Sequence, residues 1–149
     1  MILASLVISF EIAKNLYEFG IRNESVLYWY QEKYNPQPEL FASGQSQKTM
    51  PWKIHISRPS KENRNVFCEY PAFTCSELGD IIPSFIKKDG IMYYFRTIRH
   101  EKEWECTFQD FNDKKLTESR GKTETDARGS LLVNLLWNKL IDISQTIIV

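Results

Sequence analysis

The fold is decided by the stretch Ile91–Phe111, which reads IMYYFRTIRHEKEWECTFQDF. Two runs rich in aromatic and β-branched residues, Ile91–Arg99 and Trp104–Phe111, are separated by the polar tetrapeptide His100-Glu101-Lys102-Glu103. Short strand-like runs joined by a polar turn are typical of an antiparallel hairpin. We therefore predict a hairpin in which Arg99 faces Trp104.

This register pairs Thr97 with Cys106 and Phe95 with Phe108, and it divides the hairpin side chains between two faces. The face predicted to join the core carries Ile91, Tyr93, Phe95, Trp104, Cys106 and Phe108. The opposite face, predicted to be partly exposed to water, carries Met92, Tyr94, Arg96, Ile98, Glu105, Thr107 and Gln109.

Helical patterns flank the hairpin on both sides. The segment Ser9–Phe19 has a good N-cap at Ser9 and polar residues along one side, and Gly20 is suited to end the helix. After the hairpin, the acidic start Thr123–Asp126 opens a helix that we predict to reach about Asp142. Its apolar stripe carries Ala127, Leu131, Leu132, Leu135, Leu136, Leu140 and Ile141. We expect both helices to cover one face of the sheet that contains the hairpin.

A short connecting helix is predicted between Thr74 and Pro83. Thr74 and Glu77 have the spacing of a capping box, in which the two side chains satisfy the unpaired amides of a helix start. Pro83 cannot donate to the helical hydrogen bonds and ends the helix. The apolar residues of this helix are Leu78, Ile81 and Ile82.

The remaining segments give weaker signals. Val26–Tyr30 has the aromatic composition of a strand, whereas residues 34–65 read as a loop-rich insertion interrupted by prolines. Within that insertion, Trp52–Ile56 alternates as a short strand does, and residues 48–64 are locally basic. The apolar residues 1–8 are expected to form a buried strand or the lead-in to the first helix, because no basic residue precedes them as in a signal peptide.

Together these elements predict an α+β fold. We expect a single domain over residues 1–149, with an antiparallel sheet that has a central hairpin and packs against the N-terminal and C-terminal helices. The short helix at Thr74 connects them. The apolar residues Thr146–Val149 are expected to be buried, either against the start of the chain or against another subunit.

Composition excludes several classes of protein. The chain has 149 residues, of which 42% are hydrophobic, so it can bury a sizeable core and is neither a disordered tail nor a coiled coil. Its 19 basic and 19 acidic residues cancel, so it lacks the positive field that general nucleic-acid and acidic-membrane binders use. Three cysteines are too few, and odd in number, for a secreted disulfide framework. We therefore expect a cytoplasmic protein with no membrane partner.

Candidate catalytic and metal-binding groups are sparse. Zinc sites usually show pairs of ligands two to four residues apart, and no such pair exists. Neither histidine has a recognisable setting for activating a cysteine nucleophile, and there is no glycine-rich phosphate loop. We predict no cofactor, no metal and no identifiable small-molecule substrate. The residues considered for these roles are Cys68, Cys75, Cys106, His55 and His100.

One enzymatic alternative is a small metal-dependent nuclease. Glu103 and Glu105 lie on one side of a hairpin strand, and with Asp80 or Asp110 they could hold a magnesium ion. A solvated acidic face opposite Arg96 accounts for the same pattern. The nuclease hypothesis predicts that the carboxylates converge in one cleft with raised pKa values.

Aromatic residues indicate a binding surface. Exposed aromatic and Arg side chains are what protein partners favour, so the preferred function is a non-enzymatic interaction module that binds another protein or a second copy. The alternative is a single-stranded nucleic acid that stacks on the same rings beside the basic loop. The predicted binding residues are Tyr28, Trp29, Tyr30, Tyr94, Arg96 and Ile98.

Several stretches resemble a group of small proteins from phages, prophages and related mobile regions of bacteria, notably gut Bacteroidetes. The resemblance is carried by Tyr70–Leu78 (YPAFTCSEL), by Ile82-Pro83, by the first helix and by Asp126–Leu136. It implies a bacterial or phage origin and implies no activity. A second, weaker resemblance is to the antitoxin partner of a mobile-element toxin pair, whose strands lead through a Gly-Thr-x-x-Asp-Ala-like turn into a helix. Gly121, Thr123, Asp126 and Ala127 approximate that turn.

Overall fold

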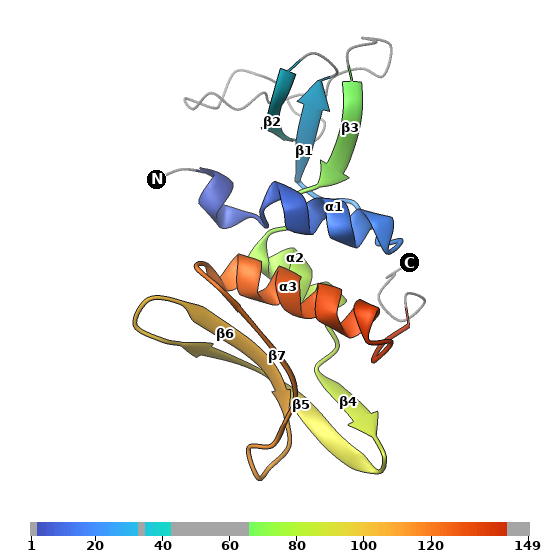
Figure 1. Ribbon diagram of the computed structural model, residues 1–149, viewed down its shortest axis with the longest axis vertical. Helices are drawn as coiled ribbons and strands as arrows, with labels where there is room; N and C mark the ends of the chain where they lie inside the picture. The colour runs from blue at the N-terminus through green and yellow to red at the C-terminus, as the bar shows by residue number, and fades with distance from the viewer. Residues whose placement is uncertain (1–2, 33–34, 43–65, 143–149) are drawn as a thin grey trace.

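The structure is a computed structural model, and it describes residues 3–32, 35–42 and 66–142 (Figure 1). The predicted strand Trp52–Ile56, the basic stretch 48–64 and the apolar end Thr146–Val149 lie outside the described residues. The helical elements are a 3-10 turn at Leu3–Leu6 and the helices α1 (Phe10–Glu18), α2 (Cys75–Ile81) and α3 (Glu124–Trp137). The strands are β1 (Leu27–Glu32), β2 (Asn35–Ala42), β3 (Val66–Pro71), β4 (Phe85–Lys88), β5 (Ile91–Arg99), β6 (Trp104–Gln109) and β7 (Lys115–Gly121).

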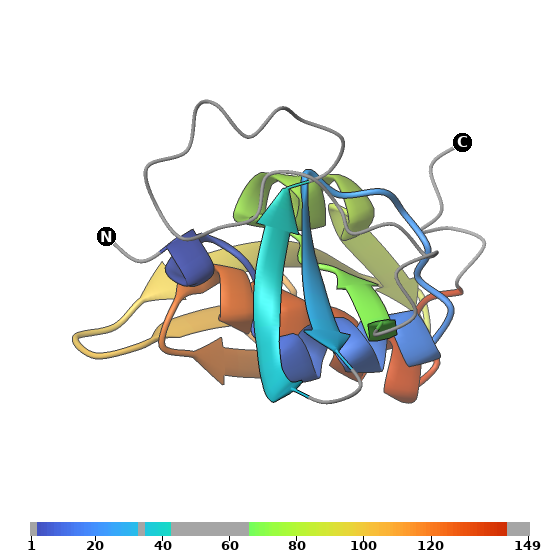
Figure 2. The same ribbon diagram turned by 90° about the horizontal axis from the view of Figure 1, so that it is seen from above.

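These elements form the predicted α+β fold, with the strands sorted into two antiparallel sheets. The small sheet has the order β2-β1-β3, and the large sheet has the order β4-β5-β6-β7. Figure 1 shows the helices between the two sheets, and Figure 2 shows the strands of the small sheet crossing α1. Helix α3 packs on β6 and β7 of the large sheet and contacts both α1 and α2. Helix α1 therefore packs on α3, and α3 in turn packs on the large sheet that contains the hairpin.

The central hairpin has the predicted register. Arg99 pairs with Trp104, Thr97 with Cys106 and Phe95 with Phe108. The turn is closed by a hydrogen bond from the backbone N–H of His100 to the carbonyl oxygen of Glu103, at 2.8 Å. Alternation of side chains then carries Tyr93, Cys106 and Phe108 into the core beneath α3, where each is buried. Ile91, also expected in the core, is 40% exposed at the start of β5.

A second hairpin, β4–β5, was not predicted. Its two-residue turn is Asp89-Gly90, and both residues have positive φ, 53° and 80°. This is the backbone of the turn that joins strands with the right-handed twist of a sheet, and Asp-Gly is a preferred sequence for it. The dipeptide is therefore the sequence signal for β4.

Strand β7 adds a bulge that determines which side chains share a face. Phe108 pairs with Thr117 and Gln109 with Lys115, so Leu116 is the extra residue. Because of the bulge, Leu116 packs on the core while Lys115 lies on the same face as Glu118. Without the extra residue, strict alternation would place Lys115 and Glu118 on opposite faces.

The helix starts follow the predicted caps. In α2 the Glu77 backbone N–H donates to Thr74 Oγ1 at 3.2 Å, and Thr74 N–H donates to Glu77 Oε1 at 2.9 Å, which completes the capping box. In α3 the hydroxyl oxygen of Thr123 accepts from the backbone N–H of Asp126 at 3.0 Å. Helix α1 has Ser9 at its N-cap position, as predicted, but the Ser9 side chain makes no capping hydrogen bond.

The end of α3 corrects the prediction of a helix reaching about Asp142. The helix stops at Trp137, and Lys139 has φ 55°. The backbone N–H of Lys139 donates to Leu136 at 3.2 Å, and that of Leu140 donates to Leu135 at 2.9 Å. These two bonds form a Schellman motif, which closes a helix and turns the chain back on itself. Ile141 is therefore buried beyond the helix rather than within it.

Strand β2 corrects the prediction that residues 34–65 are mostly loop, because Asn35–Ala42 forms a strand that contains Pro36 and Pro38. β2 is at the edge of the small sheet, and Leu40 pairs with Trp29 of β1. Proline lacks an N–H to donate, and an edge strand tolerates this because, among the described strands, only one of its sides is paired.

The apolar start leads into α1, as expected. Val7 forms an isolated bridge with Thr74, and Ile8 donates its backbone N–H to Phe73 at 3.0 Å. Both Val7 and Ile8 are buried. Among the helices of the described residues, none is long and apolar enough to cross a membrane.

Candidate functional site

The large sheet has one face turned away from the helices, which we call the open face. Figure 1 shows the α-helices on the other side of this sheet. The pairs Phe85–Tyr94 and Tyr94–Gln109 are directly opposite in register, so their side chains share this face. The open face carries Phe85, Lys87, Met92, Tyr94, Arg96, Ile98, Glu105, Thr107, Gln109, Lys115, Glu118 and Arg120.

The half of the open face nearest β4 is aromatic and exposed. Phe111, in the β6–β7 turn, is 86% exposed, and its ring lies 5.1 Å from the ring of Tyr94. Phe85, the cross-strand neighbour of Tyr94, is 51% exposed. A groove of about 550 Å³ runs beside these rings. It is lined by Tyr94, Phe95, Arg96, Gln109, Asp110, Phe111 and Asp113.

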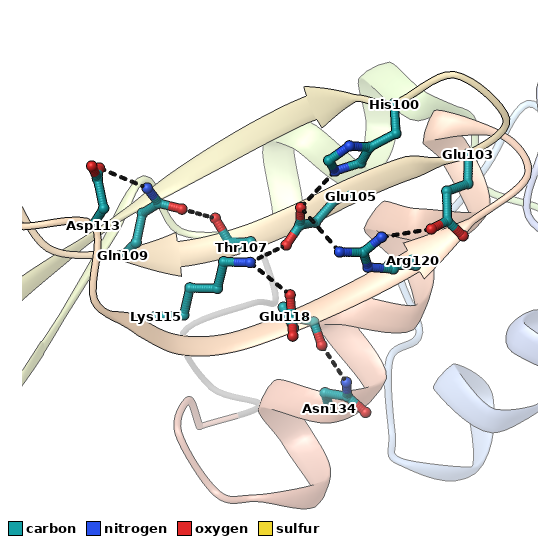
Figure 3. Close-up of polar contacts among 10 residues, drawn as sticks. All are labelled: His100, Glu103, Glu105, Thr107, Gln109, Asp113, Lys115, Glu118, Arg120 and Asn134. Carbon is teal, nitrogen blue, oxygen red and sulfur yellow. Dashed lines mark hydrogen bonds and ion pairs between the residues drawn. The ribbon is translucent and has the colours of Figure 1, made fainter.

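A chain of polar contacts runs from Thr107 to the groove residues Gln109 and Asp113 (Figure 3). The buried Thr107 hydroxyl donates to Gln109 Oε1 at 2.8 Å, and Gln109 Nε2 donates to Asp113 Oδ1 at 3.1 Å. Arg96 Nη1 donates to the same oxygen of Asp113 at 3.3 Å. The Asp113 carboxylate is therefore held by one buried amide and one exposed guanidinium.

The turn that carries Phe111 is built by Asp110. Asp110 Oδ1 accepts from the backbone N–H of Asn112 at 2.9 Å and from that of Lys114 at 2.8 Å. Asp113 adopts the left-handed conformation with φ 62°, which Asp tolerates better than most residues. These hydrogen bonds involve the polar residues of the turn and not Phe111, whose side chain points to solvent.

The other half of the open face is charged and centres on Glu105, which is only 2% exposed (Figure 3). Its carboxylate contacts Lys115 Nζ at 2.5 Å, His100 Nε2 at 2.8 Å and Arg120 Nη2 at 3.7 Å. Lys115 also pairs with Glu118 at 2.9 Å, and Arg120 pairs with Glu103 at 2.6 Å. Acids and bases thus neutralise one another across β6 and β7.

The ionised form of Glu105 is favoured in spite of burial. Hydrogen bonding with the Glu118 carboxyl and with the Lys115 ammonium lowers the pKa of Glu105 to about 2, and the His100 contact acts in the same direction. The two carboxylates in turn raise the pKa of Lys115. The charged half is therefore a network of ion pairs that joins β7 to β6.

This network corrects the prediction that the acids are solvated opposite Arg96. Glu105 is paired in the sheet with Ile98 and Arg120, and Thr107 with Arg96 and Glu118. Glu105 and Thr107 are thus flanked by side chains of β5 on one side and of β7 on the other. The β6 side of the face predicted to be partly wet is therefore buried, with Glu105, Thr107 and Gln109 at 2%, 0% and 5% exposure.

The geometry also lacks what the nuclease hypothesis requires. The pKa of Glu105 is lowered, not raised, and Glu103 pairs with Arg120. Asp110 accepts the backbone amides of its own turn, and Asp80 is exposed on α2. Within residues 3–32, 35–42 and 66–142, no group of three or more His, Cys, Asp or Glu side chains is arranged to hold a metal ion.

Of the two described free cysteines, Cys106 is buried and Cys75 is partly buried. Burial, together with a hydrogen bond to Glu124, raises the pKa of Cys75 to about 11. Burial likewise raises the pKa of Cys106 to about 11. A nucleophilic cysteine needs a lowered pKa, so neither thiol is activated. His55 and the side chain of Cys68 lie outside the described residues.

The structure separates the predicted binding residues into two groups. Tyr94, Arg96 and Ile98 lie together on the open face. Tyr28 and Tyr30 are buried in the small sheet at 7% and 2% exposure, so the prediction that they extend the exposed surface is wrong.

Trp29, between these tyrosines, is half-buried, and its Nε1–H donates to the carbonyl oxygen of Ile8 at 2.7 Å. Its ring also packs edge-on against Phe10 of α1, at 6.3 Å between centroids. The aromatic run of β1 therefore joins the small sheet to α1 and does not form a stacking platform for bases.

Sequence reasoning did not single out Phe85, Phe111 or Asp113 for the surface. The signal for Phe111 is its place in Asp110-Phe-Asn-Asp113, where an aromatic residue is surrounded by turn-forming residues. The signal for Phe85 is the Asp-Gly turn that returns β4 onto β5.

Comparisons with protein-family models, with curated proteins and with solved structures find no match for the chain.

Proposed function

We propose that the protein is a non-enzymatic interaction module of phage or mobile-element origin, and that the aromatic half of its open face binds another protein. The observation that carries the proposal is the ring cluster of Phe85, Tyr94 and Phe111 around an exposed Arg96. Aromatic and Arg side chains are the residues most enriched in the energetic centres of protein interfaces.

The cluster is not needed by the core. Phe111 is 86% exposed at the tip of a turn that Asp110 closes through its backbone contacts, so the aromatic ring contributes little to folding. An aromatic ring that stays exposed to water adds little to the stability of the fold. Burial of the same ring against a partner protein would stabilise the complex. The adjoining groove gives a partner side chain a place to insert.

The proposed origin rests on the resemblance of Tyr70–Leu78 and of Asp126–Leu136 to phage and prophage proteins. We also propose a cytoplasmic location, because Cys75 and Cys106 are both unpaired thiols and a reducing compartment keeps thiols in this state. Phage structural or toxin genes beside the coding region would support the origin, and their absence across related genomes would contradict it.

The test of the binding function is a selection of peptides on the immobilised full chain. A random library of 12-residue peptides displayed on phage is expected to yield sequences that bind the wild type and bind Phe111→Ser at least ten-fold more weakly. The matched control is Trp137→Ser, since Trp137 is 73% exposed at the end of α3, away from the open face.

Peptides that bind both variants as well as the wild type, or a library that yields no binder, would overturn the proposal. Sedimentation velocity of the wild type is measured alongside. A dimer that Phe111→Ser dissociates would identify a second copy of the chain as the occupant.

A further inference from the structure

We infer that the groove beside Phe111 is a receptor for a carboxylate, and that Asp113 occupies it from within the chain. This inference rests on the proposed binding function and names the chemistry of the segment bound. The occupant is a stretch of a partner protein in which an Asp or Glu side chain lies next to a large apolar residue.

The donors of the receptor are preorganised. Gln109 is 5% exposed, and the Thr107 hydroxyl fixes its amide by donating to Oε1, which turns Nε2 toward the groove. Arg96 supplies a guanidinium whose side chain is 54% exposed. An amide N–H and a guanidinium N–H that converge on a single oxygen form a site for a carboxylate, because both groups are donors and one of them is charged.

The present occupant is held weakly enough to be replaced. Arg96 and Asp113 meet through one contact at 3.3 Å, and the Asp113 side chain is 77% exposed. Exposed ion pairs of this kind contribute little free energy, since water and salt compete with both partners. Rotation of the Asp113 side chain into solvent leaves the Gln109 and Arg96 donors available to an incoming carboxylate.

The rings beside the receptor specify the rest of the occupant. Tyr94 lies next to Arg96 on the open face and contacts Phe111 at 5.1 Å between ring centroids. An apolar side chain adjacent to the bound carboxylate therefore meets two aromatic rings. Asp110 also lines the groove, but its Oδ1 already accepts two backbone N–H groups of its turn, whereas the Arg96 guanidinium favours an acidic segment over a basic one. Lys114, exposed in the same turn, adds to this preference for an acidic segment.

The experiment uses the peptides enriched by the selection described above, synthesised with acetylated and amidated ends. Each peptide is made in its original form and with every Asp and Glu replaced by Asn and Gln. Calorimetry is expected to show at least ten-fold weaker binding of the amide form to the wild type. The variant Arg96→Gln is expected to bind the acidic and amide forms with equal affinity.

The second arm tests the internal occupant. Asn at position 113 keeps the left-handed backbone and the shape of the side chain and removes only its charge. Asp113→Asn is therefore expected to bind the acidic peptides about three-fold more tightly than the wild type, and the amide peptides with unchanged affinity. The matched control is Arg99→Gln, an exposed Arg of the same strand on the opposite face, which is expected to change neither affinity.

The outcomes separate the two claims. Peptides that bind through Phe111 but show no difference between acidic and amide forms would overturn the carboxylate receptor and leave the binding function standing. Acidic peptides that bind Asp113→Asn no more tightly than the wild type would overturn the internal competition. Failure of the selection itself would count against the binding function.

Discussion

At the scale of single residues, Glu105 combines near-complete burial with full ionisation. A buried carboxylate is unfavourable unless charged and hydrogen-bonding partners replace the water it has lost. Lys115 and Arg120 supply these partners from β7, and His100 supplies one from the β5–β6 turn. The bulge at Leu116 is what turns Lys115 toward Glu105, so one extra residue in β7 permits the buried charge.

The first prediction concerns Lys115. Lys115→Met keeps most of the apolar stem and removes the ammonium, which leaves His100 and Arg120 as the basic partners of the Glu105 carboxylate. We expect a marked fall in the urea midpoint of unfolding, because removing one partner of a buried ion pair leaves an uncompensated charge. The control is Lys114→Met, which removes the ammonium of the neighbouring exposed lysine and is expected to shift the midpoint several-fold less. Equal shifts in the two variants would show that the Glu105 pair adds nothing to stability.

The second prediction follows from the low pKa of Glu105. Because folding lowers this pKa from its ordinary 4.5 to about 2, the ionised carboxylate stabilises the folded state fully above pH 4.5. That contribution is lost as the pH falls from 4.5 through 2. Unfolding free energies of the wild type and of Glu105→Gln, measured in urea between pH 7 and pH 2.5, are expected to fall less steeply for the variant below pH 4.5. Parallel curves for the two proteins would contradict the lowered pKa.

At the scale of elements, local signals at the ends of helices proved sufficient where they were present. The capping box at Thr74 and Glu77 and the cap at Thr123 both form as their spacing predicts. The end of α3 was not predictable in the same way, because the apolar stripe continues through Leu140 and Ile141. Lys139, rather than a glycine, adopts the left-handed conformation there, so no residue marks the helix end.

The third prediction tests this helix end. Lys139→Gly is expected to raise the free energy of unfolding by about 0.5–1 kcal/mol, because glycine adopts positive φ without the steric cost that a side chain imposes. The measurement is urea unfolding followed by circular dichroism. The neighbouring Asn138→Gly serves as the control, since Asn138 has φ −88° and gains nothing from glycine. A loss of stability in Lys139→Gly would contradict the Schellman assignment.

The strands show which parts of the fold the sequence could not reveal. The β5–β6 register followed from alternation, because both strands carry apolar residues on one face. β7 did not show this alternation, since its bulge places Leu116 and Lys115 out of phase with the rest of the strand. The candidate site was half predictable for the same reason. Alternation along β5 predicted that Tyr94 and Arg96 share one face. The positions of Phe111 and Asp113 depend instead on the geometry of the β6–β7 turn.

At the scale of the whole molecule, α3 is the element that joins the layers. It packs on β6 and β7 on one side and on α1 on the other. The backbone N–H of Ser9, at the start of α1, donates to Asp126 Oδ1 in the first turn of α3 at 2.8 Å. The open face can remain uncovered in the described part of the chain because this central helix already buries the opposite face of the large sheet.

The last prediction tests the contact between α3 and the N-terminal segment. Gly129 is buried, and a Cβ at this position would lie 2.7 Å from Cγ2 of Ile8 and 2.8 Å from Cγ2 of Ile12. Ala favours a helix over Gly by about 1 kcal/mol, whereas overpacking a closed core costs about 1–3 kcal/mol. Since both methyl groups belong to β-branched side chains and cannot rotate away cheaply, we expect Gly129→Ala to destabilise the protein by about 1 kcal/mol net.

The neighbouring Ser130→Ala provides the matched control, because it changes helix propensity in the same turn without entering that contact. We expect it to be neutral or slightly stabilising. The cost of Gly129→Ala is expected to shrink in an Ile12→Ala background, because the double variant removes one of the two clashing methyl groups. A stabilising Gly129→Ala, or a cost unchanged by Ile12→Ala, would mean that α3 does not depend on close approach to the N-terminal segment. The layered arrangement, with α3 at its centre, would then need a different explanation.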